Sequence, residues 1–338
     1  MKAILPVAGV GSRLRPHTHT VPKALVHVAG KPILGHILDS LQPAGIDEVV
    51  LVVGYLGEQV VDYVKNTYDL RVQVVEQEER LGLGHAIFLT RECVQEGEPV
   101  LIVLGDTIVQ ADLASVLQRG VTAIGVREVD NPSNFGVVQL EGGRIQKLME
   151  KPQEPPTNLA VVGVYYIQNS SLLFHSLEEI IAQDIRTGGE LQLTDGLQML
   201  LQQQPMQKMI DAGEPMEVFN VDDWLDCGNP ETLLATNRYL LAANGYTPFQ
   251  RRSDVIVIPP VYIDSGADLE NCIVGPYVSI ANGAQISNAL IRDSIINEGA
   301  YVSDLLLEKS LVGHRAVVQG RFSRLNIGDS SEITTAEL

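Results

Sequence analysis

Basic residues are scarce in this chain of 338 residues. Lysine and arginine together number 24, against 42 aspartates and glutamates, which gives a formal net charge of -18 at pH 7. A chain with this excess of negative charge is not expected to bind nucleic acid or an anionic membrane surface non-specifically. The same charge would repel a phosphate-bearing substrate, so a phosphate site in this chain requires a local cluster of cations or a bound divalent metal.

Cysteine and long apolar runs are also scarce. Cys93, Cys227 and Cys272 lie far apart and form no C-x-x-C pair, which indicates neither a disulfide framework nor a zinc site. No uninterrupted apolar segment is long enough to span a bilayer, and Met1-Lys2 leads into a predicted strand without the features of a signal peptide. We therefore expect reduced thiols and a cytoplasmic location.

Two glycines end the first apolar run. Lys2 to Ala8 has the pattern of a buried parallel strand, and Gly9 and Gly11 follow it. Glycines two residues apart let the backbone approach a bulky polar group, and the N–H groups of such a turn favour an anion. Because two prolines prevent a regular helix, Arg13 and Lys23 would project from an irregular loop. The segment predicts a phosphate site beyond the first strand.

Two commoner glycine motifs do not fit this segment. The dinucleotide fingerprint G-x-G-x-x-G requires glycine at position 14, where the chain has Leu14. The P-loop requires a Gly-Lys-Ser/Thr triplet, which does not follow. Taken alone, a Gly-x-Gly sequence is also consistent with a tight turn that carries two surface cations.

Predicted strands and helices alternate after this loop. The apolar patterns predict strands over 48–53, 72–76 and 100–104, and helices over 33–41, 58–66 and 85–94. Such an alternation is typical of a parallel, doubly wound sheet, whose ligands lie beyond the carboxyl ends of the strands.

A glutamine follows one of these predicted strands. Gln77 is separated by a few residues from the glycine-rich sequence L-G-L-G-H-A, which contains Gly82. A glutamine amide offers a donor and an acceptor in one plane, which suits the edge of a pyrimidine. A solvated loop is the commoner interpretation of such a feature in isolation. His85 is expected to make a structural contact and no acid–base contribution.

An aspartate ends the next predicted strand. Asp106 closes the sequence V-L-I-V-L-G-D, where a carboxylate can hold Mg²⁺ at the edge of a sheet. The alternative is that Asp106 caps a helix predicted over 111–117. Asp112 is better placed for that role.

Small aliphatic residues recur every five or six positions in the C-terminal part of the chain. Gly, Asn, Ser and Asp occupy many of the positions between them. Repeats of this kind predict a parallel β-helix, in which each coil buries aliphatic side chains against its neighbours. The recurring residues are Ile263, Leu269, Val274, Ile280, Ile286, Ile291, Ile296, Val302, Leu307, Val312 and Val318.

The N-terminal string G-x-G-x-R-L-x-P-x-T-x-x-x-P-K-x-L resembles the opening motif of the sugar-1-phosphate nucleotidylyltransferases. The resemblance is greatest to the branch that contains glucose-1-phosphate thymidylyltransferase. In the same family resemblance, Q-x-x-x-x-G-L-G-H-A is the base-recognition segment and L-G-D is a metal motif. W-x-D-x-G matches the second metal carboxylate and selects Asp226, whereas spacing alone does not separate it from Asp222 and Asp223.

Two further segments, N-F-G-V-V and M-E-K-P, resemble the sugar-binding segments of the family. The resemblance implies that Gly136 presents its backbone to the hexose, that Glu150 accepts hydrogen bonds from its hydroxyls, and that Lys151 holds its phosphate. Residues 158–167 are predicted to form a strand, whose Gly163 could likewise admit the sugar. Taken alone, Glu-Lys-Pro is an ordinary surface turn. The string G-E-L-Q-L-T-D resembles another family motif, whose acidic residues are as suited to ordering the following helix as to contacting a ligand.

The resemblance implies transfer of a nucleotidyl group from dTTP or UTP to a hexose 1-phosphate, with glucose 1-phosphate the expected acceptor. Arg13 would bind the departing pyrophosphate, Lys23 would offset charge on the α-phosphoryl group, and Lys151 would align the attacking phosphate. The implied cofactor is Mg²⁺, which Asp106 and Asp226 would bind. The residues implied to contact the nucleotide are Gly9, Gly11, Gln77 and Gly82. The attacking oxygen is already anionic at neutral pH, so the reaction requires no general base.

The implied fold is α/β, a Rossmann-like nucleotidyltransferase domain with a mixed, mainly parallel sheet, followed by a short left-handed parallel β-helix. The expected boundaries are 1–240 for the first domain, 241–252 for a linker, 253–325 for the β-helix and 326–338 for a tail. Another subunit is expected to cover the coil ends and aliphatic flanks, which predicts a homo-oligomer.

Three alternatives stay open from the sequence. A mannose-1-phosphate guanylyltransferase shares the opening motif, and a non-catalytic paralogue would share the fold. A bifunctional enzyme with acetyltransferase activity in the β-helix would have His314 as its plausible base.

Overall fold

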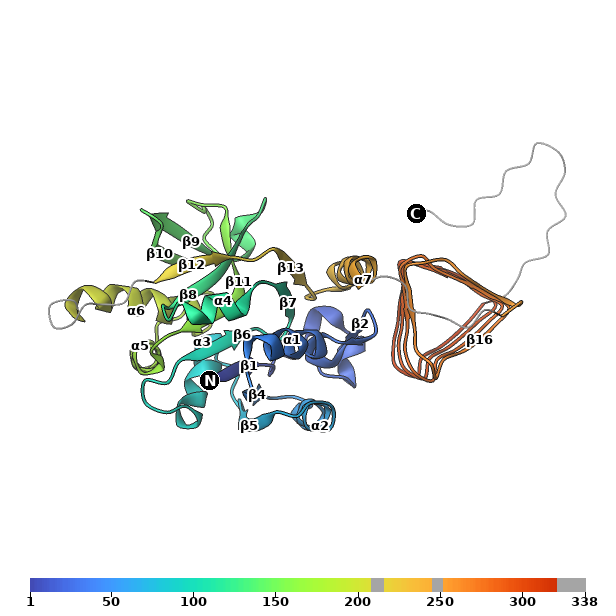
Figure 1. Ribbon diagram of the computed structural model, residues 1–338, viewed down its shortest axis with the longest axis horizontal. Helices are drawn as coiled ribbons and strands as arrows, with labels where there is room; N and C mark the ends of the chain where they lie inside the picture. Colours follow the sequence, from blue (N-terminus) through green and yellow to red (C-terminus); the bar gives the residue numbers. More distant parts are fainter. Residues whose placement is uncertain (208–215, 245–251, 321–338) are drawn as a thin grey trace. The chain divides into compact units, whose positions relative to one another are not determined.

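The computed structural model describes residues 1–207, 216–244 and 252–320 (Figure 1). The chain divides into two compact units, Met1–Thr236 and Asn237–Leu338. The parts of the predicted linker, β-helix and tail at 245–251, 321–325 and 326–338 lie outside the described residues. In the described ranges, no helix is both long enough and apolar enough to cross a membrane.

A nine-stranded sheet forms the centre of the first unit, with its main path in the order β10-β9-β11-β6-β1-β4-β5. β8 pairs with β11 and with β12. The neighbours β6, β1, β4 and β5 are parallel, whereas β11 is antiparallel to β6, β8 and β9. This is the mixed Rossmann-like sheet that the sequence predicts. The strands are β1 (Lys2–Pro6), β4 (Glu48–Val53), β5 (Arg71–Glu76), β6 (Val100–Val103), β8 (Ala123–Glu128), β9 (Gly136–Glu141), β10 (Arg144–Glu150), β11 (Leu159–Ile167) and β12 (Glu217–Asn220).

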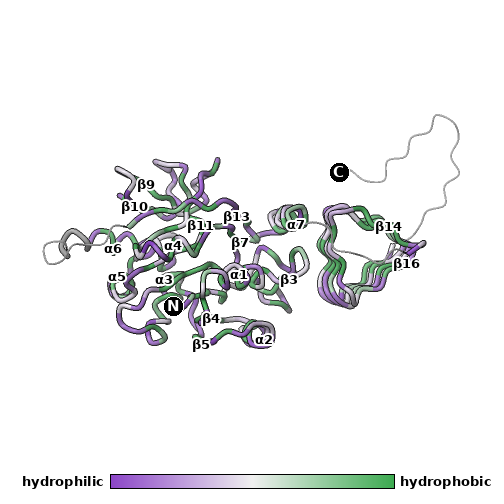
Figure 2. The backbone as a smooth tube through the Cα atoms, viewed as in Figure 1, coloured by the Kyte–Doolittle hydropathy of each residue, from purple (hydrophilic) through white to green (hydrophobic). Residues whose placement is uncertain are grey.

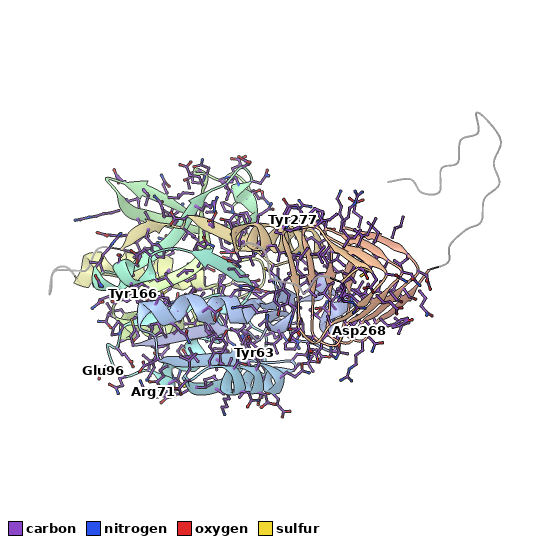
Figure 3. All side chains as sticks on the ribbon, turned by 45° about the vertical axis from the view of Figure 1, so that its right-hand side comes forward. Tyr63, Arg71, Glu96, Tyr166, Asp268 and Tyr277 are labelled. Atoms are coloured by element: carbon purple, nitrogen blue, oxygen red, sulfur yellow. The ribbon has the colours of Figure 1, made fainter. Side chains whose placement is uncertain are left out.

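The central strands are apolar because helices and loops cover both of their faces. In β4 every residue after Glu48 is buried, and the side chains of alternate residues point to opposite faces. The edge strand β5 is more exposed, and Arg71 at its start forms an ion pair with Asp47 at 2.7 Å. Arg71 lies at the periphery of the unit in Figure 3. A charged residue of this kind protects an edge strand from pairing with another chain.

Helices α3, α5 and α6 pack against one face of this sheet and share one hydrophobic core with it. The helix predicted over 85–94 is α3, continued by a 3₁₀ turn over Leu89–Cys93. Asp112 is the N-cap of α4 and accepts a hydrogen bond from the Ser115 N–H at 3.0 Å, as predicted. The helices are α1 (Ile33–Leu41), α2 (Gly57–Thr67), α3 (Leu83–Phe88), α4 (Leu113–Gln118), α5 (Ser170–Ala182), α6 (Leu193–Gln207) and α7 (Pro230–Asn244).

Two short strand pairs in this unit were not predicted from the sequence. β2 (His27–Val28) pairs with β3 (Lys31–Pro32), and β7 (Thr107–Gln110) pairs antiparallel with β13 (Asp223–Asp226). The pattern of β7 is too short to reveal a strand, and its partner lies more than a hundred residues along the chain. The β7–β13 pair is the contact that brings the two predicted metal carboxylates to one place.

The second unit contains a parallel β-helix with a triangular cross-section (Figure 1). Its three walls are four-stranded parallel sheets, in the orders β14-β17-β20-β23, β15-β18-β21-β24 and β16-β19-β22-β25. The strands are β14 (Val255–Val257), β15 (Val261–Ile263), β16 (Asp268–Glu270), β17 (Cys272–Val274), β18 (Val278–Ile280), β19 (Gln285–Ser287), β20 (Leu290–Arg292), β21 (Ile295–Ile296), β22 (Tyr301–Ser303), β23 (Leu306–Glu308), β24 (Leu311–Val312) and β25 (Val317–Gln319).

All eleven recurring aliphatic residues of the sequence lie in the core of this β-helix or pack against it. The walls alternate between hydrophobic and hydrophilic stretches (Figure 2). The end of α7 belongs to the same unit. Asn237 donates a hydrogen bond to the Tyr277 carbonyl at 3.1 Å and accepts one from Ser279 at 2.6 Å, and Arg238 forms an ion pair with Asp293. The helix therefore continues past residue 240 and is anchored on the first coils.

Ile291 and Leu306 provide a matched test of this core. Ile291 is fully buried, whereas Leu306 points outward and is 74% exposed. Because a truncated core residue leaves a cavity, we expect Ile291→Ala to lower the free energy of unfolding by about 2–5 kcal/mol. Leu306→Ala removes no buried contact within the subunit and should change the free energy of unfolding of the dissociated subunit little. The stability of both variants can be measured from the unfolding transition of the second unit in chemical denaturant. Equal losses of stability would contradict the assignment of Ile291 to the inward face.

Candidate active site

The glycine turn after β1 adopts the backbone that its sequence predicts. Gly11 has φ of 62°, and a Cβ atom at this position would lie 2.8 Å from the Lys23 Cβ. The Thr18 hydroxyl donates a hydrogen bond to the Gly11 carbonyl at 2.8 Å. Short 3₁₀ turns replace a regular helix in the loop, and Arg13 in the first of them is exposed. A residue with a side chain at position 11 would displace Lys23.

Lys23 reaches from this loop to the end of the next strand of the sheet. Its Nζ lies 2.6 Å from Asp106 Oδ2, and the Lys23 side chain is 16% exposed. Burial would raise the pKa of Asp106, but the Lys23 charge and hydrogen bonds from Lys23 and Thr107 outweigh it and lower that pKa. Asp106 is thus a carboxylate at neutral pH and already holds one cation.

The β7–β13 pair places Asp226 beside Asp106. Asp226 lies opposite Thr107 in the register, and the Cys227 N–H donates to the Asp106 carbonyl at 3.2 Å. Asp223 lies at the other end of the pair, opposite Gln110, with Arg127 at 3.8 Å from its carboxylate. The Asp222 N–H donates to that same Gln110 carbonyl at 3.0 Å. Of the three aspartates, Asp226 is therefore the one that lies next to Asp106, a distinction that the sequence spacing could not make.

Gln77 and Gly82 form a second wall. Gln77 Nε2 donates a hydrogen bond to the Gly82 carbonyl at 3.1 Å. Gly82 has φ of 123°, and a Cβ atom there would lie 2.5 Å from the Leu191 carbonyl oxygen. The Leu191 N–H donates to the Leu81 carbonyl at 2.7 Å, so the two loops are joined through their backbones. The close approach of two backbones explains why position 82 is a glycine.

A cleft of about 560 Å³ lies between these walls. This volume is in the range of small-molecule sites. The cleft brings together residues from seven separate segments of the sequence. The predicted site residues that line it are Gly9, Gly11, Arg13, Lys23, Gln77, Gly82, Asp106 and Lys151.

Four predicted site residues do not line this cleft: Gly136, Glu150, Gly163 and Asp226. Glu150 precedes the cleft residue Lys151, accepts a hydrogen bond from Thr194 at 2.8 Å and lies 3.5 Å from the Lys151 ammonium. A Cβ atom at Gly136 would lie 3.1 Å from Glu150 Oε2. Gly136 and Glu150 thus form a cluster next to Lys151. Gly163 has φ of 86° and packs against the Leu104 side chain. The backbone conformation and this close contact explain why position 163 is a glycine.

Several residues at the site were not singled out from the sequence. Ser12, Arg80 and Glu190 line the cleft, and Thr194 holds Glu150. Arg80 lies between the two residues of the proposed base segment, so its charge was a usable signal. The sequence predicts no single role for the residues of the G-E-L-Q-L-T-D string, because it does not show that this segment folds against Gly82.

The donor set around Asp106 suits a hard divalent cation. Its two carboxylates, Asp106 and Asp226, come from adjacent strand ends. A larger group, of three or more His, Cys, Asp or Glu placed to hold a metal, does not occur among the described residues. Mg²⁺ is commonly held by one or two carboxylates together with phosphate oxygens and water. Burial raises the pKa of Cys227 to about 12, so this thiol is protonated at neutral pH.

Comparison with known proteins identifies the fold and the family. The nucleotidyl transferase family matches residues 2–243. A glucose-1-phosphate thymidylyltransferase from Streptomyces griseus is 31% identical and aligns over 98% of each chain. The bifunctional protein GlmU from Methanocaldococcus jannaschii is 34% identical over 79% of this chain and 61% of its own.

The crystal structure of a UDP-glucose pyrophosphorylase complexed with UDP-glucose shares the fold. It superposes with a TM-score of 0.60 at 24% identity and covers 72% of this chain and 98% of its own. The resemblance that begins at the glycine turn therefore extends through the first unit, and the family match and the full-length relative confirm it. This chain belongs to the nucleotidyl transferase family.

Proposed function

We propose that this protein transfers a nucleotidyl group from dTTP or UTP to a hexose 1-phosphate, with glucose 1-phosphate as the preferred acceptor. The products are a nucleoside diphosphate sugar and pyrophosphate. The names of the similar thymidylyltransferase and pyrophosphorylase support this choice of substrates. The observation that carries the proposal is the cleft in which the glycine turn, the Lys23–Asp106 pair, Gln77 and Lys151 meet.

The first wall of the cleft would bind the triphosphate. The backbone of Gly9 and Gly11 offers close approach, and Arg13 and Lys23 supply positive charge. These residues provide the local cations that the net charge of -18 makes necessary. The opposite wall, with Gln77 and Gly82, would hold the base.

The acceptor would bind near Lys151. Its ammonium would align the sugar phosphate, while Glu150 and the backbone of Gly136 and Gly163 would contact the hexose. The attacking phosphate oxygen is anionic at neutral pH, so the site has to position two anions and neutralise their charge.

Members of this family are generally dependent on a divalent metal, and we assign Mg²⁺ to Asp106 and Asp226. The paired carboxylates at the strand ends fit this ion. When bound, Mg²⁺ supplies positive charge to the phosphate oxygens of the substrates. Lys23 would share that role from the other side of Asp106.

A homo-oligomer is part of the same proposal. The β-helix leaves aliphatic residues exposed on its outer wall, among them Ile256 and Leu306 in one sheet. Surfaces of this kind are commonly buried between subunits. Acetyl transfer by the β-helix is not part of the proposal, since no feature of residues 252–320, the part of the β-helix that the structure describes, favours it.

A substrate panel tests the reaction. We expect pyrophosphate release with dTTP or UTP and glucose 1-phosphate, and kcat/KM values at least about tenfold lower with GTP, because a pocket shaped for a pyrimidine discriminates against a larger base. Four triphosphates should be crossed with glucose, glucosamine, N-acetylglucosamine and mannose 1-phosphates. A preference for GTP with mannose 1-phosphate would establish the guanylyltransferase alternative instead.

A further inference from the structure

The backbone of Asp226 is held on two sides, whereas its carboxylate has no partner among the described residues. The Asp226 carbonyl accepts a hydrogen bond from the Thr236 hydroxyl at 3.1 Å. The N–H of the next residue, Cys227, donates to the Asp106 carbonyl at 3.2 Å. These contacts fix the end of β13 and leave the Asp226 carboxylate available as a ligand.

Thr236 makes its contact from the buried face of α7. The residue is 2% exposed, and its hydroxyl has a single hydrogen, which it gives to the Asp226 carbonyl. The Cys227 thiol forms a hydrogen bond with the same hydroxyl. Since this thiol is protonated, it is the donor and the Thr236 oxygen is the acceptor. Thr236 thus joins α7 to both residues at the end of β13.

The start of α7 is fixed as well. Asn229 precedes the helix and caps it, because the Thr232 N–H donates to Asn229 Oδ1 at 3.0 Å. In return, the Asn229 N–H donates to the Thr232 hydroxyl oxygen at 3.2 Å. Only Cys227 and Gly228 lie between the end of β13 and this cap. The connection from the strand to the helix therefore has little freedom to move.

Gly228 leaves the space that the Asp226 carboxylate occupies. A Cβ atom at position 228 would lie 2.9 Å from Asp226 Oδ1 and 3.1 Å from Oδ2. The backbone of Gly228 is outside the left-handed region, so its conformation does not require a glycine. Gly228 lines the cleft. The Asp226 carboxylate therefore lies directly against a residue of the cleft wall, although Asp226 itself does not line the cleft.

We infer that Thr236 and Gly228 are positioning residues for the second metal carboxylate. Thr236 holds the backbone of Asp226, and Gly228 admits its carboxylate to the edge of the cleft. This inference rests on the proposed function, which assigns a divalent cation to Asp106 and Asp226. Groups that orient a metal ligand typically contribute about 10- to 100-fold to metal affinity.

A purely structural role for Thr236 predicts a different result, and Thr90 provides the comparison. Thr90 is fully buried, and its hydroxyl donates to the Ile87 carbonyl at 2.7 Å. Thr90 does not line the cleft. Thr90→Val and Thr236→Val each remove one buried hydrogen bond to a backbone carbonyl, so both should lower the Tm. Only Thr236→Val should also change the binding of a metal.

Binding of Mn²⁺ to the full chain without substrates provides the test. The only tryptophan of the sequence, Trp224, lies in β13 two residues before Asp226, so quenching of its fluorescence by Mn²⁺ reports on the site. We expect Thr236→Val and Gly228→Ala each to weaken Mn²⁺ binding at least about tenfold. Thr236→Ser keeps the hydroxyl and should restore most of the affinity. Thr90→Val should leave the affinity unchanged.

The Tm separates the two positioning residues from each other. Gly228→Ala should lower the Tm little, because the atoms that its Cβ displaces are the carboxylate oxygens of one side chain and not backbone. Its effect on Mn²⁺ binding can therefore be measured in a folded protein even if Thr236→Val is too unstable to study.

The possible outcomes distinguish this inference from the proposed function. If neither Thr236→Val nor Gly228→Ala weakens Mn²⁺ binding, the inference is wrong. Equal weakening in Thr236→Ser and Thr236→Val would show that the hydroxyl does not position Asp226. Mn²⁺ affinities that change as expected, in a chain that transfers no nucleotide, would overturn the proposed function and leave this inference intact. If the wild-type protein binds no Mn²⁺, the metal assignment and this inference are both overturned.

Discussion

Replacement of Arg13 by alanine is expected to lower kcat for nucleotidyl transfer by about a hundred- to a thousandfold, the usual effect of removing one donor from developing charge. Arg13 lies in the 3₁₀ turn after Gly11 and lines the cleft. Pyrophosphate gains charge as it departs, and a guanidinium can bind two of its oxygens at once. A contact that strengthens as the reaction proceeds affects kcat more than substrate binding.

The fold of the Arg13→Ala variant should be unaffected. Arg13 is exposed and makes no ion pair or hydrogen bond with any described residue, so its removal breaks no contact. The Tm should therefore stay within about 1 °C of the wild-type value. Arg15, two residues further along the same loop, is exposed and does not line the cleft, so Arg15→Ala is the matched control.

Rates in both directions decide the role of Arg13. Synthesis and pyrophosphorolysis pass through the same transition state, so both rates should fall together in Arg13→Ala. Arg13→Lys keeps the charge but not the fork of donors and should recover only part of the loss. If Arg13→Ala and Arg15→Ala have wild-type rates in both directions, Arg13 has no part in the mechanism.

The sequence allowed the two-part fold to be predicted because local patterns determine most of it. Glu48–Val53 is an apolar run of the length of one strand, and β4 has those same bounds. The β-helix repeats each bury one aliphatic residue per wall, so their spacing alone indicated the coil. Gly11 and Gly82 could be predicted because a left-handed backbone or a close contact between two backbones requires a glycine, and a glycine is visible in the sequence.

The remainder of the site depends on contacts between distant segments. Asp226 lies beside Asp106 only because β13 pairs with β7, and nothing in the four residues of β7 specifies that partner. The orientation of the Gln77 amide depends on a histidine eight residues away and on the Gly82 carbonyl. The family resemblance predicted Asp226 as the second metal carboxylate, which the spacing of the aspartates in the sequence could not do. It gave no role to Arg80.

Asp226→Asn is expected to lower the transfer rate at ordinary Mg²⁺ concentrations by at least about a hundredfold, because a neutral amide binds a hard divalent cation far more weakly than a carboxylate. This variant isolates the metal contribution better than Asp106→Asn. Substitution of Asp106 also removes the partner of the largely buried Lys23 at 2.6 Å and leaves that charge unpaired, so a loss of stability would accompany the loss of rate.

Asp223→Asn is the matched control for Asp226→Asn. Both residues belong to β13, but Asp223 lies at the opposite end of the strand with Arg127 near it. Its substitution should change the rate by less than about twofold, because it removes a partly exposed ion pair outside the cleft. A wild-type rate in Asp226→Asn, with Asp223→Asn inactive, would place the second carboxylate at Asp223.

Titration with Mg²⁺ distinguishes a weakened metal site from a misplaced substrate. If Asp226 holds the ion, the rate of Asp226→Asn should rise with Mg²⁺ at concentrations where the wild-type rate is already saturated. Excess EDTA should abolish the wild-type activity, and added Mg²⁺ should restore it. If the wild-type rate persists in excess EDTA, the cations of the cleft neutralise the phosphates without a metal. The Lys23–Asp106 pair would then be an ion pair that only fixes the glycine loop to the sheet.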